Sequence, residues 1–314
     1  LPPHVLTEVI ARIKVRARLR TDDHNILQDG RFLHTFPHVA WVDVRTSVMP
    51  TYHGENAVLR LLVSTEEALT LPDLGFSQKA CKKIETALAA SGGMILATGP
   101  TGSGKTTTLY ALVRLLRTPE HSIVTIEDPI EYAIDGVRQV QANHRTGLTF
   151  PVGLRALLRQ DPDVIMVGEI RDEETAAMAI NTALTGHLVL SSLHTTSAAG
   201  ALPRLLDMKV EPYLIASTVR LVIAQRLVRR RCEASDGPPG ELTCKKCSGS
   251  GYFGRTCIYE LLLLDESVRD AVMRRAPTAE IQKLAKTETL FEVGMDKVGE
   301  GITTKEEVLR NAYD

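Results

Sequence analysis

The spacing of apolar residues predicts a small α+β unit at the start of the chain. Residues 4–19 carry apolar side chains at helical spacing, which is typical of one amphipathic helix. Three later segments, 28–31, 39–44 and 56–63, are short and partly alternating, and turns separate them. We therefore expect a small sheet packed on the helix. Together these elements predict a first domain over residues 1–66.

From residue 77 onward, short apolar runs alternate with helical stretches. The expected strands are 94–97, 122–126, 163–167 and 187–193. One helix is expected between residue 77 and the first of these strands, and the others are 107–116, 153–159, 172–184 and 198–206. This alternation is typical of a parallel sheet with helices on both faces. Residues 67–76, which include a turn cluster at 72–75, are expected to form a linker, and residues 77–314 an α/β domain.

Beyond residue 213 we expect helices, interrupted by a Gly- and Cys-rich insert at 232–257. The most apolar helix candidate covers residues 213–228. Arg220 and Arg226 interrupt it, so the sequence offers no apolar run long enough to span a membrane.

The composition is that of an ordinary globular protein, with 44% hydrophobic and 24% charged residues. The 314 residues suffice for about two domains. A formal net charge of −1 gives no general attraction to nucleic acid, which argues against a helicase or a DNA-translocating motor. The chain starts at Leu1 rather than Met and shows no secretory signal, so we expect a piece of a longer, cytoplasmic protein.

The most specific motif is a phosphate-binding loop at residues 99–106, between an expected strand and an expected helix. Its glycines let backbone N–H groups turn toward an anion at the positive end of the helix. Lys105 is placed to reach the β- and γ-phosphates, and the Thr106 hydroxyl to ligate Mg²⁺. The expected contacts of a nucleoside triphosphate are Gly99, Pro100, Thr101, Gly102, Ser103, Gly104, Lys105, Thr106 and Thr107.

Acidic residues follow two of the expected strands. Glu169 ends the apolar run 164–169, and Glu127, Asp128 and Glu131 follow the strand before it. The carboxyl ends of parallel strands form the ligand-binding edge of such a sheet. A carboxylate there can hold Mg²⁺ through water, or orient the water that attacks a γ-phosphate. The pattern does not rank Glu127 against Glu131.

Two histidines flank one expected strand and should project to opposite faces. His194, at the carboxyl end, is placed to sense a γ-phosphate or to hydrogen-bond an acid such as Glu169. His187, at the other end, fits a core or interface residue equally well.

Four motifs in this order resemble those of a known family. The phosphate loop and the segments 125–131, 161–172 and 185–196 look like the Walker A, Asp-box, Walker B and His-box motifs of the type II secretion and type IV pilus ATPases. The resemblance covers nearly the whole chain. It implies a RecA-like α/β motor domain with a parallel sheet, preceded by a small PAS-like (N2-like) α+β domain and followed by helices with the Cys-containing insert.

The resemblance also implies roles for single residues. It selects Glu131 as the general base and Glu169 as the Walker B acid, which holds Mg²⁺ through water. Members of the family are hexamers in which a neighbouring domain supplies arginines to the nucleotide. The matching arginines are Arg31 and Arg45 in the small domain and Arg155 and Arg159 in the motor domain. The alternative for each is a surface salt bridge.

The implied function is an ATP- and Mg²⁺-dependent motor for type IV pilus assembly or type II secretion. It would act at the inner face of the membrane on a platform protein and a cytoplasmic adaptor, with no nucleic-acid partner. Residues 251–261 and 301–308 are similar to the assembly branch. A pilus-retraction motor and a nucleotide-binding scaffold without turnover are the alternatives.

The five cysteines indicate a reducing compartment and metal binding rather than disulfides. Assembly-branch members carry two C-x-x-C pairs that hold a structural Zn²⁺. Here Cys244 and Cys247 form the second pair, but the first is broken, because Ser235 stands three residues after Cys232.

Cys257 is the remaining candidate for a fourth zinc ligand, beside Cys232, Cys244 and Cys247. The alternative is a metal-free insert held by the packing of Tyr252 and Phe253. Cys81 is expected to be a buried core residue.

Overall fold

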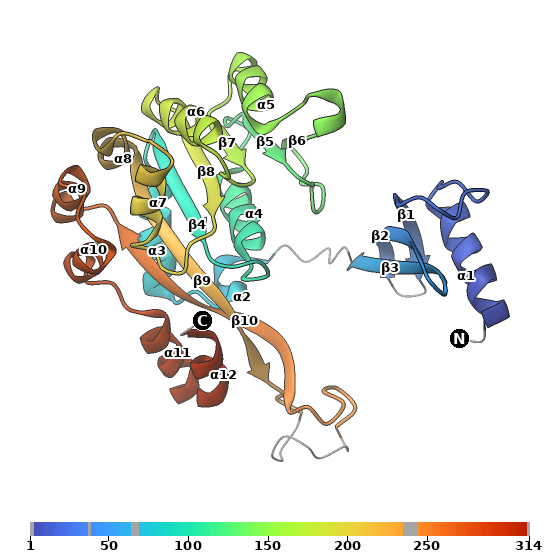
Figure 1. The fold of residues 1–314 in the computed structure, drawn as a ribbon. Coiled ribbons are helices and arrows are strands. Elements are labelled where there is room, and N and C mark those ends of the chain that lie inside the picture. The colour runs from blue at the N-terminus through green and yellow to red at the C-terminus, as the bar shows by residue number, and fades with distance from the viewer. Residues whose placement is uncertain (1–2, 37–38, 64–68, 235–243, 313–314) are drawn as a thin grey trace. The chain divides into compact units, whose positions relative to one another are not determined.

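The computed structural model, described here for residues 3–36, 39–63, 69–234 and 244–312, divides into two compact units. The smaller is Leu1–Ala68 and the larger is Leu69–Asp314. In Figure 1 the first unit is a helix beside a small sheet, and the second is a twisted sheet covered by helices.

The smaller unit contains the helix and sheet that the hydrophobic pattern predicted. Its elements are α1 (Pro3–Arg16), β1 (Gln28–Phe36), β2 (Val39–Thr51) and β3 (Gly54–Val63), and the strands are antiparallel in the order β1-β2-β3. The end of α1 approaches β1 so closely that a Cβ on Gly30 would lie 2.8 Å from the Ala17 carbonyl oxygen. Residues 28–31, predicted as one of the short segments of this sheet, begin β1. Gln28 is buried there and accepts a hydrogen bond from the Arg20 N–H (2.8 Å).

Among the described residues, the larger unit has a seven-stranded sheet in the order β10-β9-β4-β8-β7-β5-β6. The strands are β4 (Gly93–Thr98), β5 (Ile123–Glu127), β6 (Arg138–Gln141), β7 (Val164–Val167), β8 (Leu188–Leu193), β9 (Val219–Arg231) and β10 (Tyr252–Leu263). Neighbours from β9 to β6 pair in parallel, as the alternating pattern predicted. The edge strand β10 is antiparallel to β9, so the sheet is mixed.

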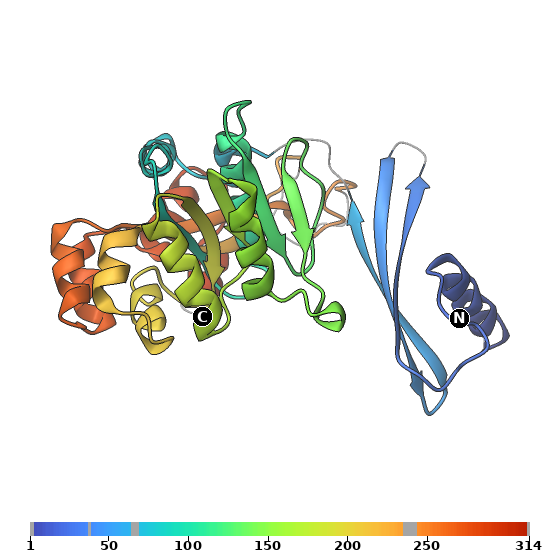
Figure 2. The same cartoon turned by 90° about the horizontal axis from the view of Figure 1, so that it is seen from above.

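Helices cover both faces of this sheet (Figures 1 and 2). They are α2 (Leu71–Leu74), α3 (Gln78–Leu88), α4 (Lys105–Leu116), α5 (Phe150–Leu157), α6 (Glu173–Leu184), α7 (Ala201–Asp207), α8 (Pro212–Thr218), α9 (Glu266–Met273), α10 (Thr278–Ala285), α11 (Leu290–Gly299) and α12 (Lys305–Ala312), with 3₁₀ turns η1 (His144–Thr146) and η2 (Leu158–Gln160). One core lies between the sheet and α2–α4, the other between the sheet and α5–α9. Successive residues of a strand such as Leu96 and Ala97 belong to opposite cores, because strand side chains alternate between faces.

The prediction of a helix over residues 213–228 is wrong. Only α8 is helical, and the chain then enters β9, which pairs with β4 on one side and β10 on the other. Leu221, Val222 and Ile223 are completely buried in this interior strand. A strand buried on both faces is a continuous apolar run, which periodicity alone does not distinguish from a buried helix.

Two further expectations need correction. Residues 72–75, predicted as a turn in a linker, include most of α2, whose first turn is closed by a capping box between Thr70 and Asp73. This helix contacts α3, α4 and β10 and belongs to the larger unit. The expected Cys-containing insert, 232–257, is too long at its carboxyl end, because residues from Tyr252 onward belong to β10.

In the described parts of the chain, the helices are all too short or too polar to cross a lipid bilayer.

Candidate nucleotide-binding site

The phosphate loop connects β4 to α4, as its sequence context required. Gly99 and Gly104 have φ angles of +148° and +89°, and Gly104 is the N-cap residue of α4. A Cβ on Gly99 would lie 2.5 Å from the Ser103 hydroxyl and 2.6 Å from the Gln225 carbonyl oxygen. Both the backbone conformation and the lack of space therefore require glycine at position 99.

Lys105 lies inside the curve of this loop. Its ammonium group donates to the carbonyl oxygens of Gly99 (2.8 Å) and Pro100 (3.0 Å). Burial lowers the pKa of Lys105, and the nearby Glu169 carboxylate opposes that shift. The side chain of Gln225, on β9, donates to the Ser103 carbonyl oxygen (2.7 Å) and holds the loop from the other side. No motif in the sequence marks Gln225, so this contact could not be predicted.

Glu169 follows β7 at the carboxyl edge of the sheet. Its side chain is 15% exposed and pairs with Arg171 at 2.5 Å. The hydrogen bond expected between His194 and Glu169 is present, with 3.3 Å between Nε2 and Oε2. The contact with Glu169 raises the pKa of Arg171, so this guanidinium stays charged. Arg171 was not among the predicted site residues.

Side-chain hydrogen bonds hold the ends of β4, β7 and β8 in register. The hydroxyls of Ser191 and Ser192 donate to the carbonyl oxygens of Val167 and Gly168, both at 2.7 Å. The Thr195 N–H donates to the Thr98 hydroxyl (3.0 Å), which ties the segment after β8 to the end of β4. The phosphate loop, Glu169 and His194 are thereby built on one edge of the sheet.

The two glutamates that the sequence left unranked have different surroundings. Glu127, the last residue of β5, is 2% exposed and accepts hydrogen bonds from Tyr110, Thr125 and Gln139. Glu131 lies in the loop that follows and is only half-buried. Its backbone N–H donates to the Tyr110 hydroxyl (3.2 Å). Of the two residues, Glu131 is the more exposed.

The predicted arginines of the larger unit have local contacts. Arg155, on α5, pairs with Glu174 of α6 (3.6 Å). The guanidinium of Arg159 donates to the Arg155 carbonyl oxygen (3.1 Å). The expected single helix over 153–159 is divided, since α5 ends at Leu157 and Arg159 lies in the 3₁₀ turn η2.

In the smaller unit, the other two predicted arginines lie opposite each other on β1 and β2. Both approach the buried Asp43 carboxylate, Arg31 at 2.8 Å and Arg45 at 3.9 Å. The Arg31 side chain is nevertheless 57% exposed.

Residues 2–310 match the family described as "Type II/IV secretion system protein". The chain belongs to this family. Among its curated relatives, Type II secretion system protein E of Dickeya dadantii is 45% identical over 96% of this chain. Type II secretion system ATPase E of Vibrio cholerae is also 45% identical over 96% of this chain. The chain spans 65% and 64% of the lengths of these two relatives.

Solved structures confirm the fold that the resemblance implied. The pilus retraction motor PilT with bound ADP has a TM-score of 0.71 and 30% identity, over 91% of this chain and 77% of that one. The ATPase DotB of Legionella pneumophila has a TM-score of 0.71 and 26% identity, with the same coverage of both chains. The larger unit is thus a RecA-like α/β domain with a mostly parallel sheet.

Three cysteines converge beside the far end of the β9–β10 hairpin. The sulfur atoms of Cys232, Cys244 and Cys247 lie within 4.8 Å of one another, and those of Cys232 and Cys244 are 3.8 Å apart. Burial acts to raise the pKa of Cys247, but hydrogen bonds from Cys244 and from backbone N–H groups outweigh it and lower the pKa to about 7. A thiolate is the form that binds Zn²⁺, and three converging thiols suit that metal. Ser235, at the broken first pair, lies outside the described residues.

Cys257 does not belong to this cluster, so its prediction as a fourth ligand is wrong. It lies on β10 opposite Leu227, and its side chain is 1% exposed in the core that also contains Cys81. Burial raises the pKa of its thiol to about 12. The alternation of side chains along β10 turns Cys257 inward, and this could not be foreseen while the segment was read as an irregular insert.

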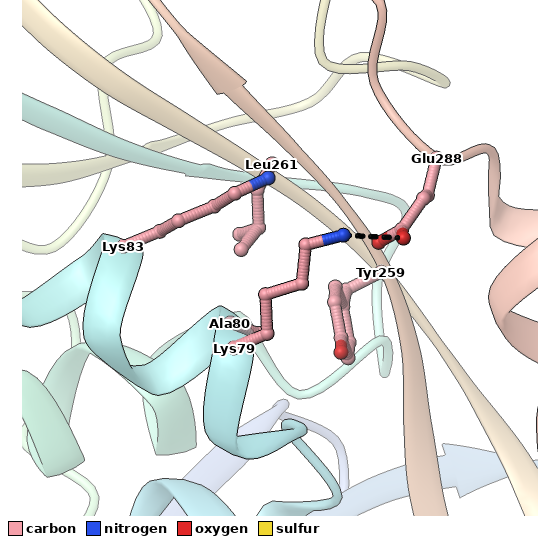
Figure 3. Close-up of a pocket in the computed structure, with 6 residues that line it drawn as sticks. All are labelled: Lys79, Ala80, Lys83, Tyr259, Leu261 and Glu288. Atoms are coloured by element: carbon pink, nitrogen blue, oxygen red, sulfur yellow. Dashed lines mark hydrogen bonds and ion pairs between the residues drawn. The ribbon is translucent and has the colours of Figure 1, made fainter.

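Two hollows lie elsewhere in the larger unit, away from the phosphate loop. The one in Figure 3, between α3 and β10, has a volume of about 10 Å³, and the Lys79–Glu288 ion pair (3.1 Å) lies in its wall. That is room for about one water molecule. A wider hollow of about 640 Å³ lies at the amino ends of β7 and β8, the edge opposite the phosphate loop. His187 lines it and donates from Nδ1 to the Thr182 carbonyl oxygen (3.2 Å).

Proposed function

We propose that this chain is the motor part of a Mg²⁺-dependent ATPase that powers type II secretion or type IV pilus assembly. The observation that carries the proposal is the meeting of the phosphate loop, Glu169 and His194 at one edge of the sheet. The curated relatives cited above are named for type II secretion, and one of them is named an ATPase. Their 45% identity exceeds the 30% identity to the retraction motor, which favours secretion or assembly over pilus retraction.

In this proposal the backbone N–H groups of residues 99–106 bind the phosphates, and Lys105 leaves the loop carbonyls to contact the β- and γ-phosphates. Thr106 and, through water, Glu169 are the residues that would hold Mg²⁺. Once bound, Mg²⁺ would neutralise charge on the phosphate oxygens.

Glu131 acts as the general base. The oxygen of a water molecule attacks the γ-phosphorus, the bond to the bridging oxygen of the β-phosphate breaks, and a proton of the water passes to the Glu131 carboxylate. Arg171 and His194 hold Glu169 in place from two sides. A nucleotide-binding scaffold that does not hydrolyse ATP is disfavoured, since Glu131 and Glu169 are both present and neither residue is fully buried.

We further propose that the chain works as a homo-hexamer, at the cytoplasmic face of the inner membrane, with a platform protein and a cytoplasmic adaptor. Arg31 and Arg45 of the small unit would then reach a nucleotide held by a neighbouring domain, together with Arg155 and Arg159 of the larger unit. The exposure of the Arg31 and Arg155 guanidiniums leaves them available to an external anion. Arginines supplied to a transferring phosphoryl group increase its rate by about 10³–10⁵.

The test is Mg²⁺-dependent ATP hydrolysis measured against protein concentration. Activity per chain is expected to rise with concentration, because each site is completed by another copy. Arg31→Ala should remove that rise while ATP binding persists, and Arg20→Ala, which removes an exposed arginine of the same unit, should not. Hydrolysis strictly proportional to protein in all three forms would refute the shared site.

We also propose that Cys232, Cys244 and Cys247 hold one structural Zn²⁺. Metal analysis of the purified chain should find about one zinc per chain. Cys244→Ser should lose it, and Cys257→Ala should retain it, since Cys257 lies in the core. Zinc bound equally well by Cys244→Ser would show that this cluster is not the site.

A further inference from the structure

A buried hydrogen-bond network joins the phosphate-loop helix to the loop that carries Glu131. At its centre is Tyr110, on α4, whose side chain is completely buried. Its hydroxyl donates to the Glu127 carboxylate and accepts from the Glu131 backbone N–H (3.2 Å). A single oxygen atom thus connects the end of β5 with the segment that follows it.

Glu127 is held from several sides. Oε2 accepts from Tyr110, and Oε1 accepts from Thr125 (2.6 Å) and from the side-chain amide of Gln139 on β6 (3.1 Å). The same Gln139 side chain accepts from the Ile134 N–H (2.7 Å), three residues beyond Glu131. The loop is therefore attached to the network at Glu131 itself and at Ile134 beyond it.

The chemistry of this network suits positioning rather than proton transfer. Glu127 is 2% exposed and both its oxygens are engaged by donors, so it is not available to a water molecule in the site. Burial and the Glu127 charge raise the pKa of Tyr110, so its hydroxyl stays protonated. A hydroxyl that donates to a carboxylate becomes a better acceptor, and this strengthens its bond to the Glu131 N–H.

We propose that Tyr110 and Glu127 are positioning residues that set the place of Glu131 relative to the bound phosphates. Tyr110 lies on the same helix as Lys105 and Thr106. The network therefore fixes the position of Glu131 relative to the helix that would bind the phosphates. This inference rests on the proposed function of Glu131. It gives the first acid of the motif, Glu127, a role that the sequence could not assign.

The test is Tyr110→Phe, which removes the hydroxyl and keeps the ring. We expect kcat for ATP to fall about tenfold to a hundredfold, because small displacements of a catalytic group cost rates of that size. The Kd of a non-hydrolysable ATP analogue should change less than about twofold, since the phosphate loop is untouched. The matched control is Tyr132→Phe, which removes a hydroxyl from the ring packed edge-on against Tyr110 (centroids 4.6 Å apart), and it should keep kcat.

Combining the change with Glu131→Gln separates positioning from general damage to the structure. If Tyr110 acts through Glu131, then Tyr110→Phe lowers single-turnover hydrolysis in the wild-type background and has no further effect in Glu131→Gln. Equal losses in both backgrounds, or a parallel loss of analogue binding, would overturn the proposal. If Glu131→Gln alone leaves hydrolysis unchanged, the proposed base fails instead, and the two failures are distinguishable.

Glu127→Gln is the second variant, in case Tyr110→Phe does not fold. It keeps the shape of the side chain and removes the charge that polarises the tyrosine. It should lower kcat with the Kd of the analogue unchanged, and an unchanged kcat in this folded variant would contradict the proposal.

Discussion

The carboxyl ends of β5 and β7 look alike in sequence and differ in the structure. At each of them an apolar run is followed by acidic residues, Glu127 at β5 and Glu169 at β7. At β5, Glu127 is sealed in the core by the neutral donors Tyr110, Thr125 and Gln139. At β7, Glu169 keeps contact with solvent and is engaged by two side chains that can carry positive charge, Arg171 and His194.

The difference shows how one local pattern serves two purposes. A carboxylate held by neutral donors in the core is fixed and polarises its neighbours, so it can organise a loop. A carboxylate that solvent still reaches can accept a hydrogen bond from a metal-bound water while its two side-chain partners orient it. The three experiments that follow test this distinction, in order of decreasing expected effect.

The largest effect is expected at the end of β7. Glu169→Gln keeps the size of the side chain and removes its charge, so ATP hydrolysis should fall by about 10²–10⁴ while nucleotide binding persists. Steady-state phosphate release and equilibrium binding of ATP measure the two quantities. Hydrolysis within a few-fold of wild type would show that Glu169 is not part of the chemistry.

A smaller loss is expected when a partner of Glu169 is removed. His194→Ala deletes the hydrogen bond to Oε2 and should lower kcat about tenfold, because Glu169 then loses one of its two orienting contacts. His187→Ala is the control, since this histidine lies at the opposite edge of the sheet. If both variants lost activity equally, the loss would come from the strand and not from Glu169.

The smallest effects are expected in the free energy of unfolding. They should differ between the end of β5 and the end of β7. Thr125→Val leaves Glu127 without one buried donor and should lower the free energy of unfolding of the larger unit by about 1–3 kcal/mol. Arg171→Ala removes an ion pair whose arginine is 59% exposed and should cost less than about 1 kcal/mol. Urea unfolding of both variants gives the two values. A larger loss of unfolding free energy in Arg171→Ala than in Thr125→Val would contradict the distinction between a buried carboxylate at β5 and an exposed one at β7.

Much of the site could be predicted from the sequence because the chemistry there depends on local order along the chain. The phosphate loop needs only a strand, glycines and a helix in succession, and all are present between Gly93 and Leu116. The placement of Glu169 and His194 followed from the rule that parallel strands present their carboxyl ends at one edge. Their hydrogen bond was expected and is present.

The contacts that sequence reasoning missed join segments far apart in the chain. Gln225 meets the phosphate loop only because β9 pairs with β4, and the reading of residues 213–228 as a helix hid that pairing. Tyr110 looks like one more apolar position of α4, and nothing local marks its hydroxyl as the meeting point of two glutamates. Cys257 was grouped with the other cysteines by proximity in sequence, whereas the geometry of β10 buries it in the core.

The central claim is that ATP bound at the phosphate loop is hydrolysed with Glu131 as the base. The most direct measurement compares ATP binding and Mg²⁺-dependent phosphate release for the wild-type chain and for Glu131→Gln. The account predicts equal binding and a loss of phosphate release of about 10²–10⁴ in the variant. Turnover that is indifferent to Glu131, or binding without turnover in the wild-type chain, would contradict it.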